Sequence, residues 1–480
     1  MRKIFFLLFF LGLFFGVCFS SYAEWASVLP PDVSSNWSLR AVHLTSSNEG
    51  WAVGVDDSEI LTVNGVLLHY TNGTWESVIP PDVSLSWWLN SVYFVSTTEG
   101  WAVGQDFFNR KGIILNYSDG SWKSVNLPEV GSWWGLLKVH FPSPTEGWAV
   151  GSIDLIDFSR AVLLHYSNGS WELITLPEVS SNWSLNDVYF PSSDEGWAVG
   201  WDFLKSLNYK GVLLHYTNGS WEAVPSPDVS ASWYPLSLHF TSPMEGWAVG
   251  ADWTNKKGLL LHYANGVWES VAPPSVSSDW WLRSVHFSSP TEGWAVGKDN
   301  SNIRGVLLHY SNGSWKLVSS PEVSDRWELY HVHFISPSEG WAVGDDNFNS
   351  EGVLLSYSSL LDLTGQWTSL VQTCINTPKR NKCFIRGSFT IQNTGSQKVS
   401  SSAVKFYLSD DNTYDEKDTL LKEGKTGNIG VGQNKVINFG YSFPFGETAS
   451  GKYIIAAIDA DNVIIESNEA NNHIAYGPIP

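Results

Sequence analysis

Short apolar segments separated by polar turns repeat along most of the chain. In the first unit these segments cover residues 39–44, 51–54, 65–70 and 75–79. Asn72-Gly73, between the last two segments, is the dipeptide favoured in tight hairpins, because both central positions need a positive φ. Pro80-Pro81 ends the fourth segment. No segment reaches the length of about ten residues that an amphipathic helix needs, so the pattern predicts four short antiparallel strands.

The motif Glu-Gly-Trp-Ala-Val-Gly occurs seven times and sets the period of the repeat. Its tryptophans are Trp51, Trp101, Trp148, Trp197, Trp247, Trp294 and Trp341. Fourteen residues earlier stands a second tryptophan, at Trp37, Trp87, Trp134, Trp183, Trp233, Trp280 and Trp327. Twelve residues before that stands a third, at Trp25, Trp75, Trp122, Trp171, Trp221, Trp268 and Trp315. Four strands in each unit of 47 to 50 residues predict an all-β fold, a seven-bladed β-propeller with tryptophans in its core.

The two ends of the repeat region predict how the ring closes. Residues 24–30 match residues 74–80, so this region begins with a fourth strand. The last unit has only its first three strands, which end at Tyr357. The N-terminal strand is therefore expected to complete the last blade and leave no free edge. Trp367 is an alternative closing residue, but it follows Tyr357 by ten residues instead of five and fits better in the next domain.

The N-terminus predicts export. Arg2 and Lys3 precede an apolar run, and small residues follow it at the usual cleavage spacing, so residues 1–23 have the pattern of a secretory signal peptide. A retained anchor is the alternative. We expect the propeller over 24–358, a linker over 359–364 and a β-sandwich over 365–480. The mature chain is expected to be a monomer without an integral membrane segment, secreted to an extracellular or periplasmic location or held at a cell surface.

The net charge limits the classes of ligand, and the cysteine content predicts a disulfide. The formal net charge is −20, and removing Arg2 and Lys3 changes it to −22. This balance disfavours nucleic acid, because binding to phosphates depends on Lys and Arg. It is compatible with cationic ligands, with Ca²⁺ or with solubility alone, and solubility is the simplest explanation of the three. Cys374 and Cys383 are the only cysteines beyond the signal segment, and in an exported chain they predict one disulfide.

The repeat resembles BNR/Asp-box propellers. The stretches 49–51, 65–68 and 72–75 carry the resemblance, which is nearest to the Ycf48/HCF136-like photosystem II assembly factors and covers residues 24–358. It implies a propeller used for binding. The arginine cluster of sialidases and the arginine-rich patch of the photosystem factors are not matched here, so the resemblance supplies no catalytic residue.

The C-terminal region resembles CARDB domains, which are Ig-like modules of bacterial and archaeal surface proteins. Residues 387–395, 404–411, 451–456 and 466–472 carry this resemblance. Alternating short strands with Gly and Asn turns independently predict a sandwich. The resemblance implies adhesion or spacing at a cell surface.

One face of the propeller concentrates the candidate ligand-binding residues. The loops after the second and fourth strands of a blade emerge on the same side, and the variable stretch of the repeat lies in the loop after the second strand. Aromatic rings stack on sugars while carboxylates accept hydroxyl protons, so this face could bind carbohydrate. The candidates are Trp37, Trp87, Trp88, Trp133, Trp134, Trp183, Trp233, Trp280, Trp281, Trp327, Asp56, Asp106, Asp202, Asp252, Asp299 and Asp346. The alternative is that the repeated tryptophans cap the core of each blade.

Other polar positions give weaker signals. The acidic stretch 410–418 offers oxygen atoms from Asp410, Asn412, Asp415 and Asp418, the ligand type that Ca²⁺ prefers. A solvated acidic turn is the alternative. Repeated histidines such as His43 are interpreted as strand-surface aromatics. The glutamate before each Gly-Trp is interpreted as a turn carboxylate that accepts backbone N–H bonds.

The function expected from these patterns is binding. Active sites break symmetry because one blade must supply groups that the others lack, whereas the seven units are nearly interchangeable. We therefore expect a non-enzymatic, secreted or cell-surface binding or adhesion protein with a multivalent face, whose partner is carbohydrate or an exported protein. A scaffold or assembly factor for another exported protein is the alternative, and a glycan-active hydrolase is a distant third. Ca²⁺ is the only cofactor considered.

Overall fold

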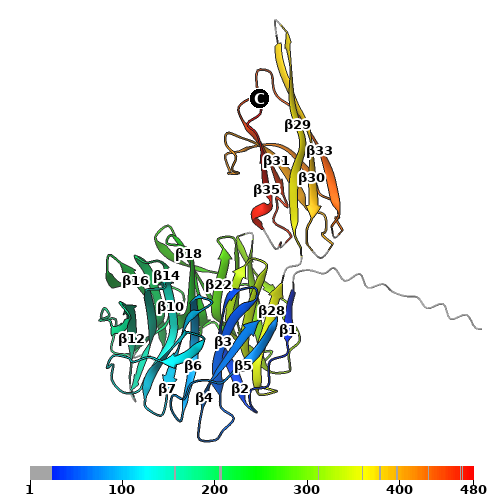
Figure 1. Ribbon diagram of the computed structural model, residues 1–480. Coiled ribbons are helices and arrows are strands. Elements are labelled where there is room, and N and C mark those ends of the chain that lie inside the picture. Colours follow the sequence, from blue (N-terminus) through cyan, green and yellow to red (C-terminus); the bar gives the residue numbers. More distant parts are fainter. Residues whose placement is uncertain are drawn as a thin grey trace, which may run out of the picture.

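The computed structural model describes residues 24–155, 158–204, 208–311, 313–358, 361–377, 380–395, 398–430, 432–464, 466 and 469–480. Residues 1–23, where the signal peptide is predicted, lie outside this part of the chain. Seven four-stranded antiparallel sheets form a ring, and a smaller sandwich of two sheets follows (Figure 1). The predicted all-β fold of a seven-bladed propeller and a small sandwich is confirmed. Among the described residues, no helix has both the length and the apolar character to span a membrane.

Each blade is a meander whose first strand lies nearest the axis of the ring. Blade 1 contains β2 (Trp37–Ser46), β3 (Glu49–Asp56), β4 (Asn64–Thr71) and β5 (Thr74–Val78). Blade 2 contains β6 (Trp87–Ser96), β7 (Glu99–Asp106), β8 (Lys111–Ser118) and β9 (Ser121–Ser124). Blade 3 contains β10 (Trp134–Ser143), β11 (Glu146–Leu155), β12 (Phe158–Ser167) and β13 (Ser170–Leu173). Blade 4 contains β14 (Trp183–Ser192), β15 (Glu195–Phe203), β16 (Tyr209–Thr217) and β17 (Ser220–Val224).

The remaining blades follow the same order. Blade 5 contains β18 (Trp233–Ser242), β19 (Glu245–Asp252), β20 (Lys257–Ala264) and β21 (Val267–Val271). Blade 6 contains β22 (Trp280–Ser289), β23 (Glu292–Asp299), β24 (Arg304–Ser311) and β25 (Ser314–Val318). Blade 7 contains β26 (Trp327–Ser336), β27 (Glu339–Asp346), β28 (Glu351–Ser358) and, from the N-terminus, β1 (Glu24–Val28).

The N-terminal strand closes the ring as predicted. β1 pairs antiparallel with β28, in a register that runs from Glu24 opposite Ser358 to Val28 opposite Leu354. The Trp25 ring packs edge-on against Trp294, with ring centroids 5.3 Å apart. This contact repeats the one between Trp75 and Trp341 at the next junction. The last blade is therefore assembled from both ends of the repeat region.

The core of the propeller lies between neighbouring blades. At one junction, Trp51 of blade 1 stacks parallel to Phe94 of blade 2 at 5.7 Å and meets Trp122 edge-on at 5.3 Å. Offset and edge-to-face geometries such as these are favourable for aromatic pairs. The glycine of each Trp-Ala-Val-Gly motif permits close strand approach, because a methyl group at Gly54 would lie 1.9 Å from the carbonyl oxygen of Ser38. The Trp-Ala-Val-Gly motif recurs in every blade because every junction between blades uses the same edge-on tryptophan contact and every blade uses the same close strand approach.

The C-terminal sandwich has a three-stranded and a four-stranded sheet. The first is ordered β29 (Leu363–Thr377), β30 (Arg380–Asn393) and β33 (Asn434–Ser442). The second is ordered β32 (Thr419–Lys425), β31 (Ala403–Ser409), β34 (Tyr453–Ile458) and β35 (His473–Tyr476), and a short 3-10 helix, η1 (Glu469–Asn471), precedes β35. Trp367 is buried in the core of this domain and does not close the ring. The predicted disulfide between Cys374 and Cys383 links β29 to β30.

The propeller has two distinct faces. The loop face carries the loops after the second and fourth strands of each blade, such as residues 57–63 and 79–86. The turn face carries the tight turns, in which Asn72 and Gly73 have the predicted positive φ values of 49° and 95°. The sandwich stands on the turn face (Figure 1). Burial, together with the nearby Glu292 of blade 6, raises the pKa of Glu469 in η1 to about 7, which places η1 beside blade 6.

Candidate functional site: the loop face

The seven repeated tryptophans of the innermost strands do not reach the loop-face surface. Their side chains are 2 to 5% exposed, which holds for Trp37, Trp87, Trp134, Trp183, Trp233, Trp280 and Trp327. Six of the seven rings cover a glycine of the preceding blade, and Ala161 takes the place of this glycine before Trp183. A methyl group at Gly65, for example, would lie 2.3 Å from the ring of Trp87. These residues cap the core and offer no ring face for stacking on a ligand, so we withdraw them from the candidate site.

The repeated aspartates hold the loops together. In blade 2 the Asp106 carboxylate accepts hydrogen bonds from the Ser84 hydroxyl at 2.8 Å and from the backbone N–H and side-chain amide of Asn109 at 2.8 and 2.6 Å. Asp106 is 0% exposed. The same serine contact at 2.6 to 2.8 Å is made by Asp56, Asp202, Asp252, Asp299 and Asp346. In Asp106, Asp252, Asp299 and Asp346 both carboxylate oxygens accept hydrogen bonds within the protein, so these four position the loops, whereas Asp56 and Asp202 remain partly exposed.

A sequence signal for this aspartate–serine contact exists but was missed. A serine stands 22 residues before each of the six aspartates. In blade 3 both partners change together, because Gly131 replaces the serine and Ile153 replaces the aspartate. Both partners of the contact are therefore absent from blade 3, which indicates that the serine and the aspartate of the other blades serve this contact.

The second tryptophans, Trp88, Trp133 and Trp281, do lie on the loop face, where each is half-buried. In blades 2 and 3, Phe107 packs against Trp88 at 6.1 Å and against Trp133 at 5.3 Å. The Arg110 guanidinium lies 4.5 Å from the centre of the Trp133 ring, in cation–π geometry.

A second row of aromatic rings crosses blades 4 to 6. Tyr209 packs against Tyr234 at 5.2 Å, Tyr234 against Trp253 at 6.3 Å, and Trp253 against Trp281 at 5.3 Å. Trp253 is 40% exposed. The row ends at Trp281, where positively charged side chains begin.

We define the arginine cluster as Arg40, Arg283, Lys298, Glu328 and Tyr330, from blades 1, 6 and 7. The Glu328 carboxylate is 6% exposed and accepts hydrogen bonds from Arg283 and Lys298, both at 2.9 Å. Arg283 lies 4.6 Å from the centre of the Tyr330 ring, and Arg40 lies 5.3 Å from the same ring. Two guanidinium groups therefore share one aromatic ring.

The electrostatics of the cluster follow from burial and from its neighbours. Burial alone would raise the pKa of Glu328, but Arg283 and Lys298 outweigh burial and lower it. Burial, followed by Glu328, raises the pKa of the adjacent Asp345 to about 6. Glu328 is thus held as the charged partner of two cations, while Asp345 is only weakly acidic. The cluster gathers three cations in a chain whose net charge is −20.

Arg40 differs from the other two cations because no carboxylate of the described residues hydrogen-bonds to it, although Asp345 lies near enough for Arg40 to offset part of the rise in the Asp345 pKa. Among the described residues, no carboxylate, carbonyl or hydroxyl accepts a hydrogen bond from its guanidinium, and its Nε is buried without a partner. Arg40 and Arg283 occupy the same repeat position, three residues after the first tryptophan of the blade. The other blades place Asn90, Leu137, Asn186, Leu236 and Tyr330 there. The site therefore occurs once and not seven times.

The repeated glutamate of the turn makes different contacts from those expected from the sequence. The repeated glutamate of the turn bonds to a histidine side chain in five blades, at 2.5 to 3.2 Å, for example Glu49 to His69. These histidines stack on the tryptophan of the motif, with His69 4.2 Å from Trp51. The backbone acceptor role expected for this glutamate was wrong in these blades.

The acidic stretch 410–418 forms an exposed turn. Asp410 pairs with Lys452 at 2.7 Å and is 87% exposed at its side chain. Asp415 and Asp418 accept backbone N–H bonds from Lys417 and Asp415. In the described part of the chain, no group of three or more His, Cys, Asp or Glu residues is arranged to hold a metal ion. Binding of Ca²⁺ by Asp410, Asn412, Asp415 and Asp418 therefore stays a prediction from the sequence.

Comparisons with known proteins bear on both domains. The CARDB family model matches residues 375–475. The sandwich is called the CARDB-like domain from here on. No curated protein matches the chain.

The propeller is similar to solved structures. One, described as YCF48 bound to D1 peptide, has 20% identity and a TM-score of 0.50, over 71% of this chain and 98% of that chain. Another, YCF48 from Cyanidioschyzon merolae, has 17% identity and a TM-score of 0.49, over 70% of this chain and 99% of that chain. A Mycobacterium tuberculosis puromycin-hydrolyzing peptidase has 11% identity and a TM-score of 0.45, over 76% and 61%. At 20% identity the first of these likenesses shows the propeller fold alone.

Proposed function

We propose that this protein is an exported, non-enzymatic binding protein that holds an acidic segment of another exported protein at the arginine cluster. The observation that carries the proposal is Arg40, whose guanidinium stacks on Tyr330 and lacks an acceptor among the described residues. A planar guanidinium donates two parallel hydrogen bonds to one carboxylate. A carboxylate from a partner would supply the hydrogen-bond acceptor that Arg40 lacks among the described residues.

The neighbours of Arg40 are suited to the same task. Glu328 fixes Arg283 and Lys298 in place, so little side-chain freedom is lost when a partner arrives. Trp281 and the exposed Trp253 extend the surface with aromatic rings. Arg, Trp and Tyr are the residue types that contribute most to binding energy in protein interfaces.

The burial of the seven repeated tryptophans argues against a face of seven equal sites. A single asymmetric site suits one protein partner, so a scaffolding or presenting role is favoured over multivalent adhesion. Carbohydrate is the second candidate, because half-buried rings at Trp88, Trp133 and Trp281 lie on the same face. Export and cell-surface location rest on residues 1–23 and belong to the proposal.

The position of the CARDB-like domain is compatible with this function. It stands on the turn face, so the loop face is left open on the opposite side of the propeller (Figure 1). We propose that the CARDB-like domain spaces or attaches the propeller while the loop face engages the partner.

Acidic peptides and glycans presented side by side test the proposal. The chain from Glu24 to Pro480 would be applied to an array of Asp- and Glu-rich peptides and to an array of neutral and uronic acid glycans. We expect binding to acidic peptides that weakens with added salt, because exposed charges are screened. Arg40→Gln should weaken it by about 10-fold or more, since a hydrogen bond to a charged group contributes about 1.5–3 kcal/mol. Arg160→Gln, which alters an exposed arginine of blade 3, is the matched control.

Binding to glycans alone would favour the second candidate. Peptide binding that Arg40→Gln leaves unchanged would show that the arginine cluster is not the site.

A further inference from the structure

Seven aromatic rings, one from each innermost strand, form a closed circle around the propeller axis. They are His43, Tyr93, His140, Tyr189, His239, His286 and His333. Each ring contacts the next, with centroids 4.3 to 4.9 Å apart, and the last contact returns from His333 to His43. The circle was not foreseen, because the sequence places these residues on a strand surface without showing that seven such surfaces converge.

The imidazoles of this circle are oriented by the neighbouring blades. Nδ1 of His140 accepts the backbone N–H of Phe190, and Nδ1 of His333 accepts that of Leu44, both at 3.3 Å. In a neutral imidazole, an accepting Nδ1 leaves the hydrogen on Nε2. Nδ1 is also buried in the other three histidines of the circle. All five imidazole rings line the central cavity, and in His140 and His333 the Nε2–H is the hydrogen-bond donor that remains.

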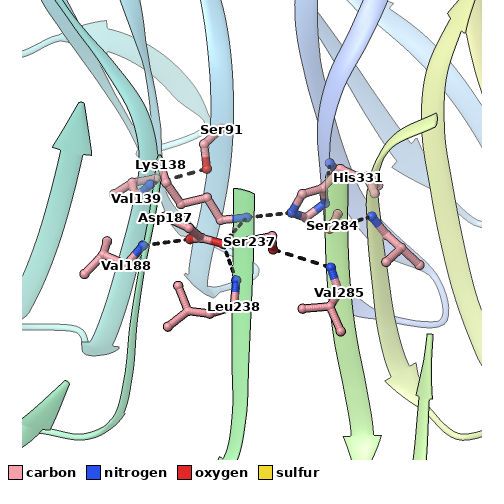
Figure 2. Close-up of polar contacts among 12 residues, drawn as sticks. Ser91, Lys138, Val139, Asp187, Val188, Ser237, Leu238, Ser284, Val285 and His331 are labelled. Atoms are coloured by element: carbon pink, nitrogen blue, oxygen red, sulfur yellow. Dashed lines mark hydrogen bonds and ion pairs between the residues drawn. The ribbon is translucent and has the colours of Figure 1, made fainter. Parts of the chain in front are cut away.

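A second layer lies two residues earlier on the same strands. It consists of Ala41, Ser91, Lys138, Asp187, Ser237, Ser284 and His331. Most of these side chains accept a backbone N–H from the next blade, as Ser91 does from Val139 at 3.4 Å and Ser284 from Val332 at 3.3 Å (Figure 2). They join the blades around the axis.

Lys138 breaks this pattern, because an ammonium group cannot accept a hydrogen bond. Its side chain extends across the lumen, and Nζ lies 2.8 Å from Nε2 of His331 in blade 7 and 4.0 Å from the Asp187 carboxylate (Figure 2). The Asp187 carboxylate is turned into the wall, where it accepts the backbone N–H groups of Val188 and Leu238 at 2.8 and 3.0 Å, and it is 2% exposed. The lumen therefore receives the ammonium group and the imidazole N–H groups.

The two layers enclose a cavity of about 110 Å³. A water molecule occupies about 30 Å³ in the liquid, so the cavity has room for one small polyatomic ion with one or two waters. Its polar lining consists of Lys138, Asp187, His331 and the seven rings of the circle. In the described part of the chain, no His, Cys, Asp and Glu group suited to a metal ion occurs, so cation coordination does not account for the histidines.

We propose that this cavity binds one small tetrahedral oxyanion, of the phosphate or sulfate class, through Lys138 and the Nε2–H groups of the histidine circle. A buried anion is stable only where several donors converge, and here donors come from several blades at once. The site is separate from the arginine cluster and does not depend on the partner proposed above. A bound ion would tie the seven blades together from the inside.

The charge state of the histidines gives the site a pH dependence. Burial first, and then neighbouring His239 and Lys138, lower the pKa of His140 to about 3. Burial first, and then His333 and Lys138, lower the pKa of His239 to about 3. These rings are neutral near pH 7, and Asp187, Tyr93 and Tyr189 also face the cavity, with pKa values that burial raises. A bound anion opposes the lowering of the histidine pKa values, so binding takes up protons and strengthens as pH falls.

Thermal unfolding in matched salts tests the proposal. The chain from Glu24 to Pro480 would be compared in inorganic phosphate, in sulfate and in chloride at equal ionic strength, at pH 6 and pH 8. A ligand that binds only the folded state raises the unfolding midpoint. We expect a higher midpoint in phosphate and sulfate than in chloride, with the larger rise at pH 6.

Two substitutions separate the site from general salt effects. Lys138→Met removes the ammonium group, and His239→Phe keeps an aromatic ring but removes the N–H. Each should weaken phosphate binding by about 10-fold or more, whereas Lys123→Met, at an exposed lysine of β9, should leave it unchanged. If a variant fails to fold, NMR of wild-type protein with ¹⁵N-labelled histidine reports the same contact, because phosphate should shift the imidazole Nε2 signals. Equal midpoints in all three salts, or unmoved imidazole signals, would overturn the proposal.

Discussion

Glu466 carries a fully buried carboxyl group in the CARDB-like domain. It is 0% exposed, and its carboxyl oxygens are buried without a hydrogen-bond partner among the described residues, while the Asn472 side chain offsets only part of the effect of burial on its pKa. Burial, followed by the nearby Glu469, raises its pKa to about 9. The group is therefore kept as a neutral acid near pH 7, because a charged carboxylate without a partner is costly in an apolar interior.

The raised pKa predicts how the stability of this domain depends on pH. The folded-state pKa lies above the usual glutamate value of 4.5, so the stabilising contribution is complete below pH 4.5 and is lost as pH rises toward 9. Glu466→Gln should raise the unfolding midpoint of the domain at pH 8 and make its decline between pH 5 and pH 9 shallower. Some decline should persist, because Glu469 and Asp459 have pKa values raised to about 7 and about 6, mainly by burial. A variant with a lower midpoint at pH 8 would show that Glu466 is ionised and paired.

At the residue scale, the sequence patterns identified which tryptophans belong to the repeat, but not the side to which each side chain points. The spacing of the tryptophans predicted a core, yet it did not separate Trp87, which is buried, from Trp88, which is half-buried on the loop face. Adjacent residues of a strand point to opposite faces, so the distinction depends on the register of β6. Arg40 was missed for a related reason. Its importance comes from contact with Tyr330, which lies 290 positions away in the chain and becomes a neighbour only when the ring closes.

At the element scale, the invariant parts of the repeat were predicted and the variable parts were not. Strands, hairpin turns and the closing strand follow from spacings that recur seven times. The aspartate–serine contacts of the loops were overlooked, because a carboxylate beside aromatic residues also fits a ligand site. Only the geometry of Asp106, with its hydrogen bonds already satisfied, distinguishes the two roles.

The closing strand β1 gives a prediction at this scale. A chain that begins at Pro31 lacks Trp25, whose ring contacts Trp294, Phe334 and Tyr357. Losing a buried tryptophan side chain costs about 3–5 kcal/mol, and each kcal/mol shifts the midpoint of a large domain by about 2–4 °C. The unfolding midpoint of the propeller should therefore fall by about 6 °C or more, measured by calorimetry. A chain that ends at Ser358 keeps β1 and should retain the midpoint, while an unchanged midpoint in the shortened chain would contradict closure by β1.

At the scale of the whole molecule, the repeated residues form the core of the seven blades, and the charged residues of both proposed sites stand where the repeat is broken. Lys138 and His331 depart from the repeat inside the channel, and Arg40, Arg283 and Glu328 depart from it at the loop face. The CARDB-like domain occupies the turn face and leaves the loop face open (Figure 1). An acidic surface elsewhere would discourage an acidic partner from binding at any position other than the arginine cluster.

Site-specific photo-crosslinking tests the central claim most directly, namely that the loop face engages an exported protein. A photoreactive amino acid would replace Trp253 in the intact chain, and in a second version Met244, both in exporting cells. The two positions belong to the same blade and are both exposed, but Trp253 lies on the loop face beside Trp281 and Met244 lies on the turn face.

We predict a crosslinked protein from position 253 that disappears when Arg40→Gln is added, and none from position 244. Crosslinking from position 244 alone, or crosslinking at 253 that Arg40→Gln leaves unchanged, would contradict a partner site at the arginine cluster.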